Sequence, residues 1–281
     1  MRILITGATG YIGRALLPSL SRSGHVLRCV VRDPSQTLAG ADEHVVLPDL
    51  FTASDGELRA ALNGIDLVIH LAWYVDARDY LHALDNLVCV SGTLRLAHEA
   101  LELGISRFVG VGTCLEYDAN YGYLTPQTPL APVSVYACAK AGVYQTLLAA
   151  YERADSDFAW ARLFHIYGGQ EDPRRLTPYL RARLAAGQVA ELTSGRQIRD
   201  YMHVDAVGEQ LSRFALSETS GAANICSGDP VTVANFAQRI AAEYGREDLL
   251  RFGARPDRPD DPACLVGEPW SAAPAIGDSR S

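Results

Sequence analysis

A short apolar run followed by a glycine-spaced loop, within residues 2–13 of the 281-residue chain, constrains the fold more than any other feature. Arg2–Thr6 is a strand candidate, three glycines follow at intervals of three residues, and a helical pattern comes next. Such a loop permits a tight turn, lets a pyrophosphate approach the backbone and lets the helix pack closely on the strand. The N–H groups at the start of the helix favour a negative charge. The predicted phosphate-binding residues are Gly7, Thr9, Gly10, Tyr11, Ile12 and Gly13.

Further short apolar runs alternate with helical patterns as far as about residue 165. The runs are rich in β-branched residues and do not alternate with polar ones, which is typical of strands buried on both faces. This order predicts an α/β protein with a Rossmann-type, doubly wound parallel sheet. The expected strands are Arg2–Thr6, Val26–Val31, His44–Leu47, Asp66–Leu71, Arg107–Val111 and Phe158–Leu163, and the main helices are Asn86–Leu103 and Ser134–Ala154.

The sequence changes character after residue 165, where polar, Gly- and Pro-bearing segments separate shorter elements. We expect residues 1–165 to form the dinucleotide-binding domain, with 200–228 returning to it, and residues 166–199 and 229–270 to form a small C-terminal lobe. Residues 271–281 are predicted to be a mobile tail. The expected later elements are helices near Pro178–Ala186, Val204–Leu216 and Thr232–Tyr244 and a strand at Ala222–Cys226.

Pro18 lies inside the helix expected after the glycine loop. Proline lacks the backbone N–H and clashes with the preceding turn, at a cost of about 3 kcal/mol in a helix interior. We therefore predict a kink or an early end of the helix at this residue.

Composition excludes several classes of protein. Hydrophobic residues make up 48% of the chain, enough to bury a core, and the net charge is −8 without any Lys/Arg-rich run, which disfavours nucleic-acid partners. No apolar stretch approaches the roughly 18 residues that span a bilayer. Six scattered cysteines lack a Cys-x-x-Cys pair, so we expect no metal site and four buried, reduced thiols. The prediction is a soluble cytoplasmic protein.

The end of the second strand indicates which dinucleotide binds. An NAD site would place an acidic residue there for the ribose 2′-hydroxyl, but the chain has Val31 followed by Arg32. Because a guanidinium pairs with a 2′-phosphate, Arg32 with Ser35 favours NADP(H). Asp33, one position later, keeps NAD(H) open. After the third strand, Asp49 is expected either to bind the adenine amine or to cap the next turn.

Tyr136 and Lys140 are four residues apart at the start of the predicted helix Ser134–Ala154, which places them on one helix face. A tyrosine is a poor acid or base at neutral pH until a nearby ammonium stabilises its phenolate. Thr113 follows the fifth predicted strand, at the sheet edge that faces ligands in this kind of fold. These three residues are the predicted catalytic group, although Thr113 has an ordinary strand-end cap as its alternative.

The chain resembles the extended short-chain dehydrogenase/reductase superfamily, in its nucleotide-sugar epimerase, dehydratase and reductase group, over about residues 1–266. The resemblance implies a seven-stranded Rossmann sheet with a small substrate lobe, and homodimers that pair helices 91–103 and 134–154. The motifs that carry it are residues 6–13 (Thr-Gly-Ala-Thr-Gly-Tyr-Ile-Gly), 70–72 (His-Leu-Ala), 112–117 (Gly-Thr-Cys-Leu-Glu-Tyr), 136–140 (Tyr-Ala-Cys-Ala-Lys), 162–168 (Arg-Leu-Phe-His-Ile-Tyr-Gly) and 199–204 (Arg-Asp-Tyr-Met-His-Val).

The same resemblance implies residue roles. Thr113 orients a substrate carbonyl, Tyr136 is the acid/base and Lys140 binds the cofactor ribose. Arg199 and Arg258 are expected to bind the diphosphate of a sugar nucleotide, with Arg255 as the rival of Arg258 and an ion pair to Asp200 or Asp205 as the alternative for Arg199. The remaining expected site residues are Leu50, Leu71 and Ala72 at the cofactor and Tyr74, Cys114 and His165 at the substrate.

Departures from the family pattern narrow the reaction. Cys114-Leu115 replaces the Asp-Glu pair of the dehydratases, so dehydration is not expected. Asparagines of the family pattern are Cys89 and His165 in this chain, and the bulky Trp73-Tyr74 replaces small residues in a position to shape a deoxysugar pocket. The closing C-terminal helices of the family are missing, which predicts a curtailed lobe.

The favoured prediction is an NADPH-dependent reductase acting on the 4-keto group of a nucleotide-activated 4-keto-6-deoxyhexose. The alternative is a nucleotide-sugar 4-epimerase that holds NAD tightly and uses the same three residues. A bifunctional enzyme would need further acid/base groups, for which Cys114 and His165 are candidates. A non-catalytic regulator that binds NAD(P) is disfavoured by the intact Thr113, Tyr136 and Lys140.

Overall fold

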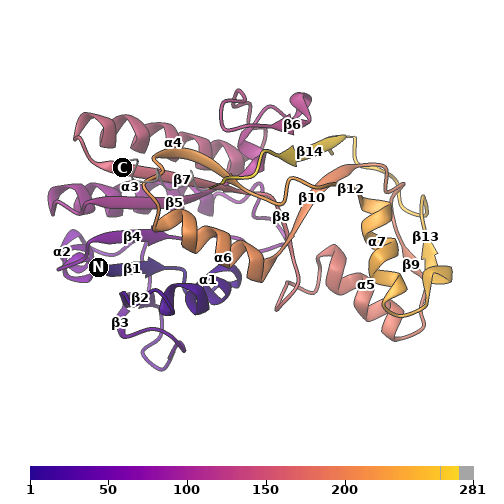
Figure 1. Cartoon of the computed structure of the whole chain (residues 1–281), viewed down its shortest axis with the longest axis horizontal. Helices are drawn as coiled ribbons and strands as arrows, with labels where there is room; N and C mark the ends of the chain where they lie inside the picture. The colour runs from indigo at the N-terminus through magenta and orange to yellow at the C-terminus, as the bar shows by residue number, and fades with distance from the viewer. Residues whose placement is uncertain (260, 272–281) are drawn as a thin grey trace, which may run out of the picture.

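Seven parallel strands form the central sheet in the order β11-β7-β5-β4-β1-β2-β3 (Figure 1). The computed structural model describes residues 1–259 and 261–271, so the tail expected at 271–281 lies almost wholly outside the described residues. The strands are β1 (Arg2–Thr6), β2 (Val26–Val31), β3 (Glu43–Val46), β4 (Leu67–His70), β5 (Arg107–Thr113), β7 (Asp157–Leu163) and β11 (Gly221–Ile225). The predicted strands are confirmed within two residues at their ends, and β5 extends to include Thr113.

Helices cover both faces of this sheet. One apolar core joins Ile3 and Ile5 of β1 to α1 (Tyr11–Ser21) and α6 (Val204–Ala215), and a second joins Leu4 to α2 (Asp55–Leu62), α3 (Asp85–Glu102) and α4 (Val135–Arg153). Successive residues of β1 therefore enter opposite cores, as a strand buried on both faces requires. This is the predicted doubly wound α/β arrangement.

The expected early end of α1 at Pro18 is wrong, because the helix continues to Ser21. Pro18 itself is exposed, whereas Leu16, Leu17 and Leu20 around it are buried against the sheet and α6. The apolar burial of these leucines, roughly 1.5–3 kcal/mol for each side chain, offsets the missing backbone hydrogen bond.

The C-terminal lobe has its own small core. Helices α5 (Leu176–Ala185) and α7 (Val233–Ala242) bury Leu180, Phe236 and Ile240 beside the strand pair β9 (Ala190–Glu191) and β13 (Leu250–Arg251). Figure 1 shows these elements at one end of the molecule, beyond the ends of the strands of the large sheet. The residue boundaries expected for the two domains stay predictions.

A second sheet connects the lobe to the larger part. Its strands are β12 (Pro230–Thr232), β10 (Ile198–His203), β14 (Cys264–Gly267) and β6 (Tyr123–Leu124), with β8 (His165–Tyr167) also paired to β10. Three short 3₁₀ helices, η1 (Cys114–Glu116), η2 (Ala119–Tyr121) and η3 (Glu247–Leu249), complete the elements. Within the described part of the chain, none of the helices is long and apolar enough to cross a membrane.

Candidate active site

The loop between β1 and α1 has the backbone geometry that its glycines predicted. Gly7 has a φ of +71°, and a Cβ added there would lie 2.7 Å from the backbone nitrogen of Ala72. A Cβ at Gly13 would overlap the backbone of Gly7 and Ala8. Gly10 is the N-cap of α1, and no side chain of the described residues caps that helix end. The cradle therefore fits a dinucleotide pyrophosphate, which would take the place of the missing cap.

Two neighbouring segments close around this loop. Leu71, directly after β4, donates its backbone N–H to the Thr6 carbonyl at 3.1 Å, so Leu71 and Ala72 run beside the glycines. From the other side, the Tyr11 hydroxyl donates to the Gly168 carbonyl at 2.7 Å. Tyr11 thus ties the start of α1 to the segment that leads into the lobe.

At the end of β2, Arg32 is exposed and directly precedes a tight turn. The Asp33 carboxylate accepts hydrogen bonds from the backbone N–H and the hydroxyl of Ser35, at 2.8 and 2.7 Å. These bonds hold the pKa of Asp33 below its usual value. Asp33 and Ser35 therefore stabilise each other in the turn, and the Arg32 guanidinium is the exposed group beside them.

Asp49 caps the turn that follows β3, as one of the two predicted roles required. Its carboxylate accepts from the Phe51 N–H at 3.0 Å and from the Thr52 hydroxyl at 2.9 Å. A shallow pocket of about 220 Å³ lies against this turn, between Leu47 and Glu57. Leu50 is 7% exposed and packs into the apolar core with residues of α2, so its expected place at the cofactor stays a prediction.

The predicted catalytic residues converge where β5 ends and α4 begins. Ser134 caps α4 by accepting from the Ala137 N–H at 3.1 Å, which fixes the turn that carries Tyr136. Lys140 is 3% exposed, and its Nζ donates to the Val111 carbonyl of β5 at 2.7 Å. The same Nζ lies 6.0 Å from the centre of the Tyr136 ring.

Burial shifts the proton affinities of this group in opposite directions. It raises the pKa of Tyr136, and a hydrogen bond from the Thr113 side chain opposes that rise. Burial lowers the pKa of Lys140 to about 7, while the Glu116 carboxylate acts in the opposite sense. Tyr136 is therefore a protonated acid at neutral pH, next to an ammonium that is close to losing its own proton.

The predicted substrate-side residues lie around the same sheet edge. Cys114 is buried directly after Thr113, and burial raises the pKa of its thiol to about 12. His165 on β8 is half-buried, and burial with the charge of Arg199 lowers its pKa to about 3. Both are therefore neutral at pH 7. The Tyr74 hydroxyl donates to Asp79 at 2.8 Å.

Three arginines are candidates for binding a diphosphate, and each lies in a different environment. Arg199 is 4% exposed, and its guanidinium donates to Asp261 at 2.5 Å and to the Ile198 carbonyl at 2.9 Å. The expected alternative partners, Asp200 and Asp205, are therefore wrong. Asp200 is buried and accepts backbone N–H groups of residues 227, 228 and 267 instead.

Arg255 binds within the lobe, where it donates to the Tyr179 hydroxyl at 3.2 Å and lies 5.0 Å above that ring. Arg258 is exposed, and its charge acts on the pKa of Tyr80, which burial raises. Tyr80 in turn packs edge-on against the Tyr136 ring at 5.1 Å. The charge of Arg258 thus acts on Tyr80 while Arg255 binds within the lobe, and the choice between them for a diphosphate stays a prediction.

Comparison with protein families agrees with this geometry. The model of the NAD dependent epimerase/dehydratase family matches residues 3–226. The chain belongs to this family. It is an NAD(P)-dependent enzyme of the extended short-chain dehydrogenase/reductase type, as the resemblance of its motifs implied.

Relatives within the family match over almost the whole chain. A dTDP-6-deoxy-L-talose 4-dehydrogenase (NAD(+)) of Aggregatibacter actinomycetemcomitans is 27% identical over 95% of this chain and 99% of its own length. A UDP-glucose 4-epimerase of Neisseria meningitidis serogroup C is 28% identical over 98% and 91%. The crystal structure of the Thermus thermophilus UDP-glucose 4-epimerase with NAD superposes with a TM-score of 0.81 at 21% identity, over 96% of this chain and 91% of that one.

A buried polar network behind Thr113 was missed by the sequence reasoning. Glu116 accepts hydrogen bonds from the Thr113 N–H, the Trp160 indole and the Arg162 guanidinium. Arg162 also donates to the Tyr117 hydroxyl, which binds the Asn224 side chain at 2.6 Å. Glu116, Tyr117 and Arg162 all belong to the family motifs given above, which was the available signal, but the motifs do not indicate that these side chains meet.

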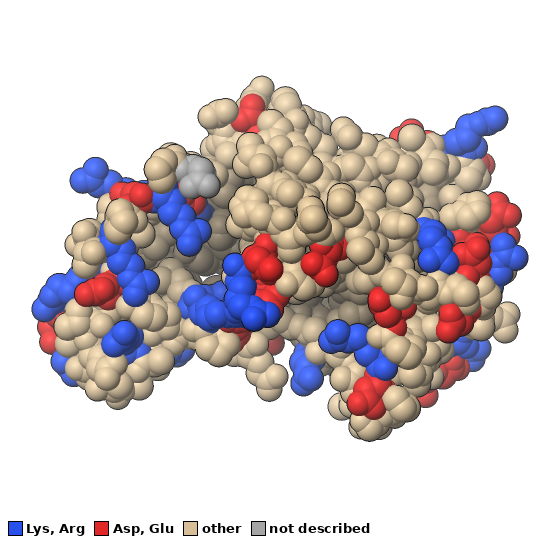
Figure 2. Space-filling view, turned by 180° about the vertical axis from the view of Figure 1, so that it is seen from behind, with Lys and Arg blue, Asp and Glu red and all other residues tan. Residues whose placement is uncertain are grey.

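Arg175, the N-cap residue of α5, is a second residue that was missed. Burial raises the pKa of Tyr11 and of Tyr80, and the Arg175 guanidinium opposes the rise in both. Its charge also contributes to the low pKa of His165. Figure 2, in which the lobe lies at the left, shows basic side chains gathered where the lobe meets the larger part. In the sequence, the available signal for Arg175 was its position beside a second arginine, at 174, in a polar segment.

Proposed function

We propose that the protein reduces the 4-keto group of a nucleotide-activated 4-keto-6-deoxyhexose with NADPH. The observation that carries the proposal is the match with the dTDP-6-deoxy-L-talose 4-dehydrogenase, which covers 99% of that protein. Its name describes oxidation at C4 of a nucleotide-activated 6-deoxyhexose, which is the reverse of the proposed reduction. The single acid at Tyr136 and the carbonyl-orienting hydroxyl of Thr113 supply what such a reduction requires.

Each residue of the proposed catalytic group has a role of its own. A bound nicotinamide cofactor supplies the hydride to C4. The Thr113 hydroxyl orients the substrate carbonyl, and Tyr136 donates its proton to the carbonyl oxygen. Lys140 donates to the cofactor ribose, and its positive charge stabilises the phenolate that Tyr136 becomes. The buried Glu116 holds the Thr113 backbone at 2.8 Å, which keeps the threonine at the end of β5.

NADP(H) is the proposed cofactor because the exposed Arg32 follows β2 directly. A 2′-phosphate would meet the guanidinium there, whereas Asp33 already accepts two hydrogen bonds from Ser35. NAD(H) is the alternative, and the name of the A. actinomycetemcomitans relative favours it.

A nucleotide-sugar 4-epimerase is the second candidate, favoured by the UDP-glucose 4-epimerases among the relatives. It would use the same Tyr136 and Lys140 but return the hydride to the opposite face of the sugar. Such an enzyme must keep its cofactor through the cycle, whereas a reductase must release it. Arg199 and Arg258 are the proposed diphosphate ligands in both cases.

A homodimer through α3 and α4 is also proposed. Around the first turn of α3, Leu84, Leu87 and Val88 are 71%, 59% and 46% exposed, which is a cluster of apolar surface that a second copy would cover. Sedimentation of the parent and of Leu87→Asp distinguishes the states: the parent should be a dimer and the variant a monomer.

One assay tests the reaction. Purified protein is mixed with NADPH or NADH and a dTDP-activated 4-keto-6-deoxyhexose, and the decrease in reduced cofactor is followed. Consumption of one cofactor per sugar supports the proposal. Inversion of UDP-glucose at C4 without net consumption, by protein that retains cofactor through gel filtration, supports the epimerase and contradicts the reductase.

A further inference from the structure

The Lys140 ammonium lies against an aromatic face. Its Nζ is 3.7 Å from the centre of the Trp73 ring and 5.9 Å from that of Trp160. One of its three N–H groups donates to the Val111 carbonyl. The contact with Trp73 has the geometry of a cation–π interaction, in which the negative face of the indole stabilises the positive charge.

Hydrogen bonds fix the Trp73 ring in this position. Its indole Nε1–H donates to the Asn86 side-chain oxygen at 2.7 Å, and Asn86 is fully buried. The Asn86 amide then donates to the Tyr80 and Ala83 carbonyls at 2.7 and 2.8 Å. Asn86 therefore links the Trp73 indole to the backbone of the segment that precedes α3, and this link fixes the position of the ring.

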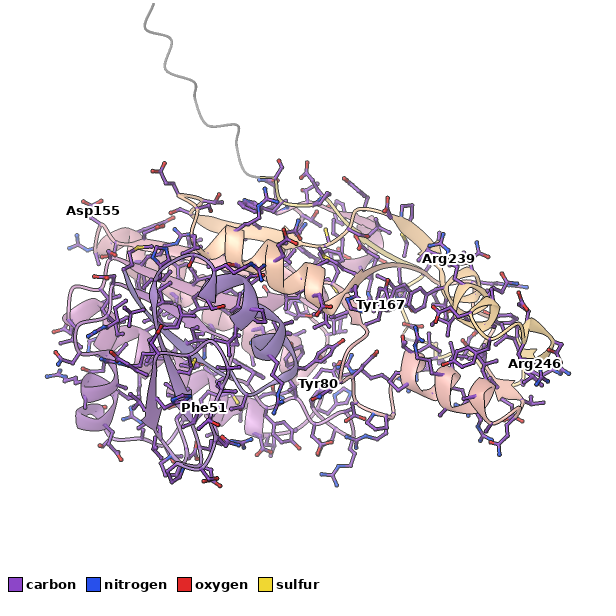
Figure 3. The ribbon with its side chains drawn as sticks, turned by 60° about the horizontal axis from the view of Figure 1, so that its bottom comes forward. Phe51, Tyr80, Asp155, Tyr167, Arg239 and Arg246 are labelled. Atoms are coloured by element: carbon purple, nitrogen blue, oxygen red, sulfur yellow. The ribbon has the colours of Figure 1, made fainter. Side chains whose placement is uncertain are left out.

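The same segment surrounds Tyr136. Trp73 meets the Tyr136 ring edge-on at 6.4 Å, and Tyr80 meets it at 5.1 Å, with interplanar angles of 80° and 79°. The Tyr136 N–H donates to the Leu81 carbonyl at 3.1 Å. Figure 3 shows Tyr80 where the larger part of the molecule faces the lobe. Trp73 therefore contacts both members of the acid/base pair.

Few other groups of the described residues stabilise the positive charge of Lys140. None of the ion pairs among residues 1–259 and 261–271 includes it, and the Glu116 carboxylate is paired with Arg162. The other titratable groups that act on it or on which it acts are Cys89 of α3 and His70 of β4. Burial brings the pKa of Lys140 down to about 7. An indole face favours the charged form without occupying the N–H groups that a ribose would bind.

We propose that Trp73 is a positioning residue that keeps the Lys140 ammonium charged and seats the Tyr136 ring beside it. The proposal rests on the roles given to Tyr136 and Lys140 under the proposed function. It assigns a role to the aromatic residue that stands where the family pattern has a small one.

The test compares Trp73→Leu, which removes the aromatic face, with Trp73→Phe, which keeps one. The affinity for NADP⁺ is measured by calorimetry across the pH range around 7. Because the charged ammonium is the stronger donor, affinity should fall as the pH rises through the Lys140 pKa. Loss of the cation–π contact lowers that pKa, so the fall should begin about one pH unit lower in the leucine variant, a tenfold change in the Lys140 acid constant. The phenylalanine variant should restore at least half of this shift.

Trp270→Leu is the matched control, because this indole packs against Phe214 at 5.4 Å, away from the catalytic group. It should leave the pH profile unchanged. A Trp73→Leu variant that binds NADP⁺ more weakly by the same factor at every pH would show a purely structural role and overturn the proposal.

A second measurement avoids any change of shape. Fluorinated tryptophan, whose ring face is less negative, is incorporated throughout the parent and throughout Trp73→Phe. The pH profile should move to lower pH in the parent alone, and an equal shift in both proteins would assign the effect to Trp160 and overturn the proposal. Normal NADP⁺ binding with unshifted profiles would contradict this inference alone, whereas a parent that binds no nicotinamide cofactor would contradict the proposed function and this inference with it.

Discussion

Glu116 and Arg162 form an ion pair that solvent does not reach, with 2.7 Å between the carboxylate oxygen and the guanidinium Nε and side chains that are 0% and 1% exposed. The carboxylate also accepts the Thr113 N–H and the Trp160 indole. It therefore joins the end of β5, which carries Thr113, to the adjacent strand β7.

Removing one partner of this pair should destabilise the protein strongly. Arg162→Met leaves the Glu116 charge buried without its partner, for which about 3–5 kcal/mol of unfolding free energy is the expected loss. The double variant Glu116→Gln/Arg162→Met, which removes both charges, should recover a large part of that loss. Urea unfolding monitored by circular dichroism measures both, and equal destabilisation of the single and double variants would contradict the assignment.

The fold was predictable because most strands of the large sheet are buried on both faces. Apolar runs such as Arg2–Thr6 and Val26–Val31 were found with the bounds that the structure shows. The early end of α1 expected at Pro18 is wrong because local propensity was weighed without the packing of α1 against α6, and the kink stays a prediction. That packing depends on Gly208, where a Cβ would overlap the Ala15 backbone.

The site was predictable where a motif is local in sequence. The glycine loop and the pair Tyr136 and Lys140 are local in sequence, so their spacing, together with their place in the strand–helix pattern, marks them as candidates. Arg199 with Asp261, and Glu116 with Arg162, are 62 and 46 residues apart. Nothing in a single sequence chooses these partners from other acidic and basic residues, since tertiary packing decides which charges meet.

Tyr136→Phe should bind NADPH with near-parental affinity but lose reduction by about a hundredfold or more, the range for removal of a positioned acid. The ring contacts with Trp73 and Tyr80 do not need the hydroxyl, so the fold should persist. Single-turnover rates and NADPH fluorescence titrations measure the two effects. Turnover within threefold of the parent would show that another group donates the proton.

Arg32→Ala should lower the preference for NADP(H) over NAD(H) by about tenfold, since a charge-assisted bond to phosphate contributes roughly 1.5–3 kcal/mol. The affinity for NAD(H) should hardly change, because that cofactor lacks the 2′-phosphate. Calorimetric titration with both cofactors gives the ratio. Arg22→Ala, at an exposed position just after α1, is the matched control. An unchanged ratio in Arg32→Ala would remove Arg32 from the cofactor site.

The free energy of unfolding should decrease as the pH falls below 6.5, because of His70. This ring is buried between the Thr6 and Thr93 hydroxyls, at 2.8 and 2.9 Å, and burial with the nearby Lys140 charge lowers its pKa to about 3. Between the unfolded value of 6.5 and about 3, the unfolded chain binds the extra proton, so stability is lost as the pH falls. His70→Gln should reduce the slope by up to about 1.4 kcal/mol per pH unit. Urea unfolding across this pH range provides the measurement, and an unchanged slope would contradict it.

In the proposed diphosphate site, Arg258 and Arg255 serve as test and control. Arg258→Ala should raise KM for the nucleotide sugar by about tenfold, because a charge-assisted hydrogen bond to phosphate is lost, and should leave the NADPH affinity unchanged. Arg255→Ala should change KM less than twofold, since that guanidinium already binds Tyr179 inside the lobe. Salt should weaken substrate binding in the parent more than in Arg258→Ala, because screening acts on the charge that the variant lacks.

Arg199 needs a different test because it is buried against Asp261. Arg199→Lys keeps the positive charge but loses the planar guanidinium that binds Asp261 and that we propose binds a phosphate as well. It should raise KM for the nucleotide sugar by about tenfold while the unfolding midpoint changes little, whereas a purely structural arginine would lower the midpoint without affecting KM. Steady-state kinetics together with thermal unfolding of Arg199→Lys and Arg258→Ala separate the two roles, and a KM within twofold of the parent would exclude that arginine from the diphosphate site.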